Sequence, residues 1–172
     1  MITLGTLPVR YEELNDLYAH TDQSHCLNHV SVPLDEEMTR SYFLAVRTGM
    51  NQGMPFLARG VYLNRKLIGK AELTVYEEGW AEADLLIRRE YENRGYGKAA
   101  LSMIMKEAEE AQFVRCFTAY IDKENLAMKA VLEQVGFTPA RTFRTDVLRP
   151  MEHGYALKEI EGVEYVYDSE NR

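Results

Sequence analysis

The chain has 172 residues, of which 46% are hydrophobic and 27% charged, enough apolar sequence for one compact domain with its own core. This composition excludes a disordered or collagen-like chain, and no apolar run reaches the roughly 18 to 20 residues that a membrane-spanning helix needs. The net charge of -7 argues against a nucleic-acid partner or an anionic membrane surface, and it is compatible with a cationic substrate such as an amine.

The N-terminal segment and the cysteines favour a cytoplasmic protein. Pro8 and Arg10 interrupt the first ten residues before any long apolar stretch, so we expect no signal peptide. Cys26 and Cys116 lie far apart in the sequence and do not make a disulfide framework. We see no repeat, low-complexity segment or linker, and we therefore expect a single domain over residues 1–172.

The predicted elements begin with a short strand over residues 1–7. Tyr11, Leu14 and Tyr18 then recur with the spacing of a first helix. A polar, histidine-containing stretch follows at 20–32. Asp35 is placed to cap a second helix, which Gly49 and Gly53 end. The apolar positions of that second helix are Met38, Tyr42, Ala45 and Val46.

Three strands follow, over residues 55–63, 66–76 and 80–87. Asn64-Arg65 predicts a hairpin turn between the first two strands, and residues 77–79 predict a second turn. A charged, glycine-bearing segment at 88–96 leads into a third helix, because apolar residues recur on one face there. These apolar residues are Leu101, Ile104, Met105 and Ala108.

The last third of the chain predicts a strand at 114–121 and a helix capped by Asn125 and ended by Gly136. The apolar stripe of that helix is Met128, Val131, Leu132 and Val135. Beyond Phe137 we expect two more strands, one around 143–148 or 155–158 and one at 163–167. This order predicts an α+β (mixed α/β) fold: a mostly antiparallel sheet of about six to seven strands flanked by about four helices.

The segment from Ala81 to Ala99 carries the clearest chemical signal. A strand ends at Ile87, a loop rich in cations follows, and a helix begins directly after it. The first turn of a helix offers unpaired backbone N–H groups and the positive end of the dipole, and Gly95 and Gly97 let the backbone approach an anion. The loop is therefore suited to a pyrophosphate, although its spacing fits neither the nucleotide-triphosphatase loop nor the dinucleotide fingerprint. Its cations are Arg88, Arg89, Arg94 and Lys98.

This loop resembles a known family. The run Glu92-Asn93-Arg94-Gly95-Tyr96-Gly97-Lys98-Ala99 is similar to the pyrophosphate loop of the GNAT superfamily of acetyl-CoA-dependent N-acetyltransferases, usually Q/R-x-x-G-x-G/A, with Glu92 where Gln or Arg is usual. Residues 125–137 resemble the family's later helix, N-x-x-[AS]-x-x-[AVL]-[YL]-[EQ]-[KQ]-x-G-F. The resemblance covers roughly 57–137. Ala81-Glu82 and Leu132 look most like the ribosomal-protein alanine acetyltransferase branch.

The resemblance implies a GNAT-like fold, acetyl-CoA as co-substrate and no metal. It implies that the strand before the loop splays at a bulge, where the backbone of Leu85 and Ile87 holds the pantetheine arm and one N–H faces the thioester. Asn125 has two compatible roles, as a helix cap and as a ligand of that arm. The full set of implied cofactor-binding residues is Leu85, Ile87, Arg89, Arg94, Gly95, Tyr96, Gly97, Lys98 and Asn125.

Acetyl transfer also needs a base, because an alkyl amine has a pKa of about 10.4 and attacks only when neutral. Glu82 and Asp84 lie two residues apart on one strand face, and the resemblance favours Glu82. The alternative is that Glu82 is an ordinary polar strand residue. Many family members have, at the position of Leu132, a tyrosine that acts as general acid and protonates the departing coenzyme thiolate. Tyr120 is the candidate to replace it here, and the alternative is that the thiolate leaves without an acid.

A histidine-rich cluster offers a competing interpretation. His20, His25, Cys26 and His29 lie close in sequence, and His25 and His29 would share a helix face, so zinc binding is an alternative. The ligand spacing is incomplete, which favours ordinary loop or surface histidines. Under the GNAT interpretation this segment and the second helix overlie the acceptor pocket. The residues that would line that pocket are His25, His29, Tyr42 or Phe43.

The sequence therefore predicts transfer of an acetyl group from acetyl-CoA to a primary amine of a small molecule or a peptide N-terminus, by direct attack in a ternary complex. We expect no nucleic-acid or membrane partner, and the family resemblance also allows a homodimer. The alternative is a non-catalytic CoA-binding or sensor module on the same fold, because position 132 lacks a tyrosine.

Overall fold

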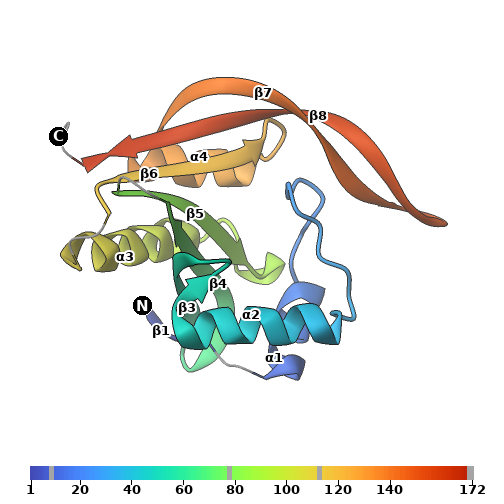
Figure 1. Cartoon of the computed structure of the whole chain (residues 1–172), viewed down its shortest axis with the longest axis horizontal. Coiled ribbons are helices and arrows are strands. Elements are labelled where there is room, and N and C mark those ends of the chain that lie inside the picture. Colours follow the sequence, from blue (N-terminus) through green and yellow to red (C-terminus); the bar gives the residue numbers. More distant parts are fainter. Residues whose placement is uncertain (8–9, 77–78, 112–113, 170–172) are drawn as a thin grey trace.

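The computed structural model describes residues 1–7, 10–76, 79–111 and 114–169. Its strands are β1 (Ile2–Thr6), β2 (Met50–Asn51), β3 (Met54–Leu63), β4 (Lys66–Val75), β5 (Trp80–Ile87), β6 (Cys116–Asp122), β7 (Thr138–Met151) and β8 (Gly154–Asp168). Its α-helices are α1 (Tyr11–Ala19), α2 (Glu36–Thr48), α3 (Tyr96–Glu110) and α4 (Leu126–Val135), with a short 3-10 turn at Arg89–Tyr91. Helices α3 and α4 pack on one face of the sheet and α1 and α2 on the other (Figure 1), as the α+β expectation required.

The sheet is open in its middle. The strands run in the order β1-β3-β4-β5-β6-β8-β7, and β2 pairs beside β3. Every described pair is antiparallel except β5 with β6, which are parallel. In that pair, Trp80–Glu82 of β5 are aligned with Cys116–Thr118 of β6. Because this pairing stops after Glu82, the rest of β5 has no strand beside it on that edge.

The first two helices form where their apolar spacing predicted them. Asp35 caps α2 by accepting a hydrogen bond from the Met38 N–H at 2.8 Å, and Gly49 ends that helix in the left-handed conformation. Gly53 was wrongly expected to help end α2: it lies in the turn between β2 and β3, with a φ of 81°. The two-residue strand β2 was not predicted. The predicted turn at 77–79 lies partly outside the described residues.

The final hairpin is much longer than predicted. The expected strands at 143–148 or 155–158 and at 163–167 all belong to β7 and β8, which have 14 and 15 residues. Residues 162–168 of β8 pair with β6, whereas residues 154–161 pair with β7 alone. That outer part is mostly exposed, with Val147 and Ile160 as its buried side chains, so little apolar alternation marks it in the sequence. Gly162 is required opposite Phe143, whose ring would lie 2.2 Å from an added Cβ.

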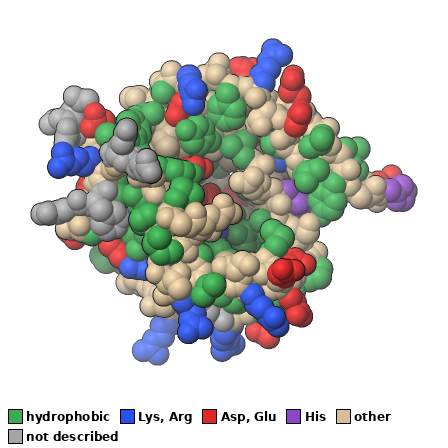
Figure 2. All heavy atoms as spheres, in the orientation of Figure 1, with side chains coloured by type: hydrophobic (Ala, Val, Ile, Leu, Met, Phe, Trp, Pro, Cys, Tyr) green, Lys and Arg blue, Asp and Glu red, His purple; other side chains and the backbone are tan. Residues whose placement is uncertain are grey.

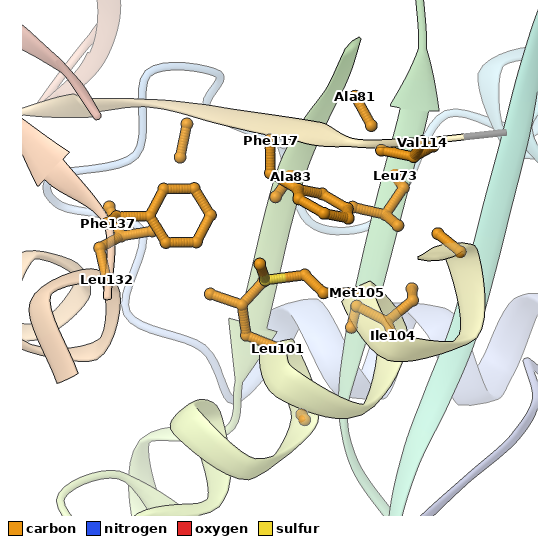
Figure 3. Packing of buried hydrophobic residues seen from close by; sticks show 14 of the residues in the cluster. Leu73, Ala81, Ala83, Leu101, Ile104, Met105, Val114, Phe117, Leu132 and Phe137 are labelled. Carbon is orange, nitrogen blue, oxygen red and sulfur yellow. The ribbon is translucent and has the colours of Figure 1, made fainter. Parts of the chain in front are cut away.

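The main core lies between the sheet and α3. Leu101, Ile104 and Met105 point from α3 toward the buried side chains of β4, β5 and β6, including Phe117 (Figure 3). Leu132 of α4 is fully buried in the same cluster. This packing fixes the N-terminal end of α3 beside the open edge of β5. Among the described residues, no helix combines the length and the apolar character needed to cross a membrane.

Candidate active site

Two cavities meet where β5 and β6 diverge. The first, of about 300 Å³, lies between the end of β5, the start of α3 and α4, and we call it the coenzyme cavity. The second, of about 460 Å³, lies between the opposite face of the sheet, α2 and the segment 20–32, and we call it the acceptor cavity. Figure 2 shows the molecule hollowed near its centre, with acidic side chains inside. The residues that line both cavities are Cys26, Leu85, Leu86, Asn125 and Met128.

Helix α3 begins without a side-chain cap. Gly95 occupies its N-cap position with a φ of 78° and makes no side-chain hydrogen bond, whereas Asp35 and Asn125 cap α2 and α4. Gly95, Gly97 and Lys98 line the coenzyme cavity. The first N–H groups of a helix have no intrahelical partner, and the dipole there favours negative charge. This end of α3 therefore fits the diphosphate that the sequence predicted.

The two glycines of the loop serve different purposes. Nothing lies within 4 Å of a Cβ added to Gly95, whose positive φ is what favours glycine. A Cβ on Gly97 would lie 3.2 Å from the side chains of both Leu85 and Val131. Gly97 therefore also lets α3 pack closely on β5 and α4, a role that the sequence argument about anion approach did not include.

The cationic residues of the loop are not all in the cavity. Lys98 lines it, but Arg89 and Arg94 do not, and neither does Tyr96. Arg89 forms an ion pair with Asp22 at 2.7 Å, and the Arg94 guanidinium lies 5.8 Å from the centre of the Tyr91 ring. Of the nine implied cofactor-binding residues, the structure brings six to the cavity: Leu85, Ile87, Gly95, Gly97, Lys98 and Asn125.

Two carboxylates also line the coenzyme cavity. Hydrogen bonds from the Ser24 side chain and backbone, together with Arg89, hold the pKa of Asp22 well below its usual range. Burial and then the charge of Asp22 raise the pKa of Glu92. Asp22 is thus compensated by Arg89, whereas Glu92, the departure from the family pattern, places an acid where the diphosphate is expected.

Strand β5 lines both cavities: Leu85, Leu86 and Ile87 line the coenzyme cavity, and residues 82–86 line the acceptor cavity. Its register on β4 runs without a shift from Ala81 to Ile87, so the bulge implied by the resemblance is wrong for this chain, and the opening arises instead where β6 departs. The Leu85 N–H donates to the Asp84 carboxylate at 2.9 Å rather than to β4. Alternation places Glu82 and Asp84 together in the acceptor cavity, as predicted.

Two tyrosines flank these carboxylates. Tyr76, which the sequence analysis missed, donates its O–H to Glu82 at 2.9 Å, and burial and this bond raise the pKa of Tyr76 to about 12. Tyr120 lines the same cavity and donates to Glu164 at 3.0 Å, and burial and this bond raise its pKa. Both hydroxyls keep their protons at neutral pH. Leu132, at the family's tyrosine position, lies in the core away from both cavities.

A buried ion pair on β4 was also missed. The Lys70 ammonium lies 2.6 Å from Glu72, and its side chain is 5% exposed. Tyr42 of α2 donates its O–H to the same Glu72 carboxylate. Burial opposes the charge of Lys70, but Glu72 raises its pKa above the ordinary value. The alternation of Lys70, Glu72 and Thr74 with apolar residues along the strand is the signal that would have placed these charges in the acceptor cavity.

The histidine segment lies against the acceptor cavity but contains no helix. His25 and His29 therefore do not share a helix face, and the predicted zinc set does not assemble. In the described part of the chain, potential metal ligands gather at one place, where His25, Asp122 and Glu124 offer atoms within 4.8 Å of one another. Asp122 is already bonded to Arg149 and to the Glu124 N–H, so this group does not favour a metal.

The segment 20–32 is held by hydrogen bonds at its start and in its middle. The Arg89 N–H donates to the His20 carbonyl at 2.8 Å, and Arg149 of β7 donates to the Cys26 carbonyl at 2.6 Å. Of the predicted acceptor-pocket residues, His25 and Tyr42 line the acceptor cavity. The other two predictions were wrong: His29 packs beside the Tyr155 ring, and Phe43 packs on the α1 side of the core.

Comparison with known proteins agrees with this architecture. A family model described as an acetyltransferase (GNAT) domain matches residues 4–138, and no curated protein matched. A Salmonella typhimurium acetyltransferase that modifies the N-terminal serine of a 50S ribosomal subunit protein is 14% identical, with a TM-score of 0.76 over 97% of this chain and 94% of that one. A ribosomal-protein alanine N-acetyltransferase from Escherichia coli is 17% identical, with a TM-score of 0.65 over 98% and 94%.

A third similar structure, the microcin C7 self-immunity acetyltransferase MccE in complex with acetyl-CoA and AMP, is 14% identical. Its TM-score is 0.72 over 97% of this chain and 92% of that one. At such identities these likenesses show the fold, whereas the family model spans well over half of the chain. This match, together with the uncapped N-terminus of α3 beside the unpaired edge of β5, shows that the chain belongs to the GNAT family of acetyltransferases, whose acetyl donor is acetyl-CoA.

Proposed function

We propose that this chain transfers an acetyl group from acetyl-CoA to a primary amine of a small molecule or a peptide N-terminus, by direct attack in a ternary complex. The observation that carries the proposal is the junction of the two cavities at Leu85, beside the carboxylates of β5. An amine in the acceptor cavity can reach a thioester in the coenzyme cavity through this opening. Both substrates therefore meet where a proton acceptor is available.

The coenzyme is held mainly by backbone in this proposal. The N–H groups at the start of α3 and the Lys98 ammonium bind the diphosphate. The open edge of β5 at Leu85 and Ile87, together with the Asn125 side chain, holds the pantetheine arm. Arg89, Arg94 and Tyr96 lie outside the cavity and support the loop. The bound coenzyme supplies the activated thioester.

Glu82 is the proposed base. Its side chain lines the acceptor cavity, and the hydrogen bond from Tyr76 fixes its orientation. Asp84, the other candidate, accepts the Leu85 N–H. A carboxylate that removes the ammonium proton contributes about 10²- to 10⁴-fold to the rate. We therefore assign proton removal to Glu82.

Tyr120 is the proposed proton donor to the departing thiolate. It lines the acceptor cavity and keeps its proton at neutral pH. Its O–H is also bonded to Glu164, and a thiolate is a good leaving group without help. Tyr120→Phe should therefore lower kcat less than Glu82→Gln.

Turnover of acetyl-CoA against a panel of amines and N-terminal peptides tests the proposal. We expect Glu82→Gln to lower kcat by at least about 100-fold while the Kd for acetyl-CoA, measured by calorimetry, stays unchanged. Glu110→Gln, at an exposed site on α3, is the matched control. A wild-type chain that binds acetyl-CoA but acetylates no amine at any pH would instead be a sensor module. Unchanged turnover in Glu82→Gln would remove Glu82 from the mechanism.

A further inference from the structure

The acceptor cavity contains more negative charge than the proposed transfer needs. Within the described residues its carboxylates are Glu72, Glu82 and Asp84, and its lysine and arginine side chains amount to Lys70 alone. Lys70 is paired with Glu72 at 2.6 Å. Proton removal uses one carboxylate, Glu82. Asp84 therefore remains as a second, exposed acid that forms no direct ion pair among the described residues, although its charge, like that of Glu72, raises the pKa of Lys70.

Asp84 is exposed and lies opposite another acid, Glu72, which is itself paired with Lys70. The register of β4 on β5 places Asp84 directly opposite Glu72, on the face that lines the acceptor cavity. Directly opposed side chains have Cβ atoms roughly 5 Å apart, and like charges there are destabilising. The field of Asp84 also reaches across the cavity, because burial and then Asp84 raise the pKa of Cys26 to about 11. A bound cation would relieve this repulsion.

The same wall already holds one cation. The Lys70 ammonium is surrounded by the Glu72 carboxylate and by the rings of Tyr18 and Tyr42, whose centres lie 5.4 and 5.0 Å from it. Carboxylates and aromatic faces together form a favourable environment for an ammonium group. The acceptor cavity continues this composition beyond Lys70, with further aromatic side chains beside Glu82 and Asp84. Those side chains are Phe56, Tyr76 and Tyr120.

Building on the proposed function, we propose that the amine acceptor is a dication, with a second ammonium or guanidinium group that Asp84 binds while Glu82 serves the reacting nitrogen. The strand rise of about 3.3 Å per residue places the two Cα atoms about 6.6 Å apart, a span that a short diamine can bridge.

The test compares putrescine with n-butylamine and with the amino alcohol of the same length, at saturating acetyl-CoA. A hydrogen-bonded ion pair predicts that kcat/KM is about 10- to 100-fold higher for putrescine, beyond the statistical advantage of its two amines. The ratio should shrink as salt is added, because screening weakens the second contact. Asp84→Asn should bring the ratio near one, whereas the control Glu110→Gln should leave it unchanged. Urea unfolding checks that Asp84→Asn folds, with a midpoint at or above that of the wild type.

Equal kcat/KM for putrescine and n-butylamine in the wild-type chain would overturn the dication proposal and leave the proposed function standing. A ratio that Asp84→Asn does not change would overturn the assignment of Asp84. If neither amine nor any other acceptor is acetylated although acetyl-CoA binds, both proposals fail together.

Discussion

The two cavities are built in opposite ways. The coenzyme cavity is formed mainly by two short stretches, residues 85–98 and 125–134, with Thr21, Asp22 and Cys26, and it offers backbone N–H groups and small residues. The acceptor cavity draws residues from α1, α2, α4, the segment 20–32 and five strands, β2 to β6, and it contains buried charge. A site built from contiguous backbone leaves a short motif in the sequence, whereas a site built from distant side chains does not.

This difference also separates the expected effects of mutation. In the acceptor cavity the Lys70–Glu72 pair is buried and lies opposite the exposed Asp84, so changes there act on stability and on substrate choice. Around the coenzyme cavity, the helix end is open and the loop is exposed, so most changes act on coenzyme affinity.

The largest effect is expected on the acceptor side, for Lys70→Met. It leaves the Glu72 carboxylate buried without its cation, and breaking such a pair costs about 3–5 kcal/mol of unfolding free energy. The double variant Lys70→Met/Glu72→Leu should recover most of the loss. Urea unfolding of the three chains measures both quantities. A single variant as stable as the wild type would show that the pair is not desolvated.

On the coenzyme side, Gly97→Val should be the most damaging change. Its branched side chain meets Leu85 and Val131 at close range, and such overpacking costs about 1–3 kcal/mol and displaces the start of α3. Gly95→Ala is the control, because the added Cβ has free space around it. The positive φ alone should lower its unfolding free energy, by about 1 kcal/mol. Urea unfolding and acetyl-CoA titration should both rank Gly97→Val as worse. The reverse ranking would contradict the packing role of Gly97.

Asn125 lies between the two cavities, and its two roles can be separated. Asn125→Ala removes the cap on Met128 and should cost about 1 kcal/mol of stability. Asn125→Asp keeps a capping oxygen but loses the amide donor. If Asn125 binds the pantetheine arm, both variants lower acetyl-CoA affinity, but only Asn125→Ala lowers the urea midpoint. Normal affinity in Asn125→Asp would leave capping as its role.

The smallest effect is expected at Glu92. Removing this carboxylate from beside the diphosphate in Glu92→Gln should raise acetyl-CoA affinity about two- to fivefold, the scale of one partly exposed charge pair. Because burial and Asp22 raise the pKa of Glu92, its carboxyl group becomes neutral at a higher pH than an ordinary glutamate. The advantage of the variant should therefore shrink as the pH is lowered from 7. A variant that binds more weakly would show that Glu92 contributes a favourable contact.

The amino-acid sequence by itself determined the fold class, the α3 apolar stripe, the α2 cap and the glycine loop at the start of α3. These features depend on local spacing, because helix periodicity, capping and turn conformation are decided within a few residues. It also placed Glu82 and Asp84 on one face of one strand, since alternation is a property of a single strand.

Only the tertiary structure decided what those residues face. β6 diverges from β5 after Glu82, Arg89 forms an ion pair with Asp22, and Asp84 lies opposite Glu72. Each of these arrangements brings together residues that are distant in the sequence. The length of the β7–β8 hairpin was likewise not predictable, because the buried side chains of its outer part are sparse, namely Val147 and Ile160. Strand register and ion-pair choice depend on packing between elements, and local sequence patterns do not encode that packing.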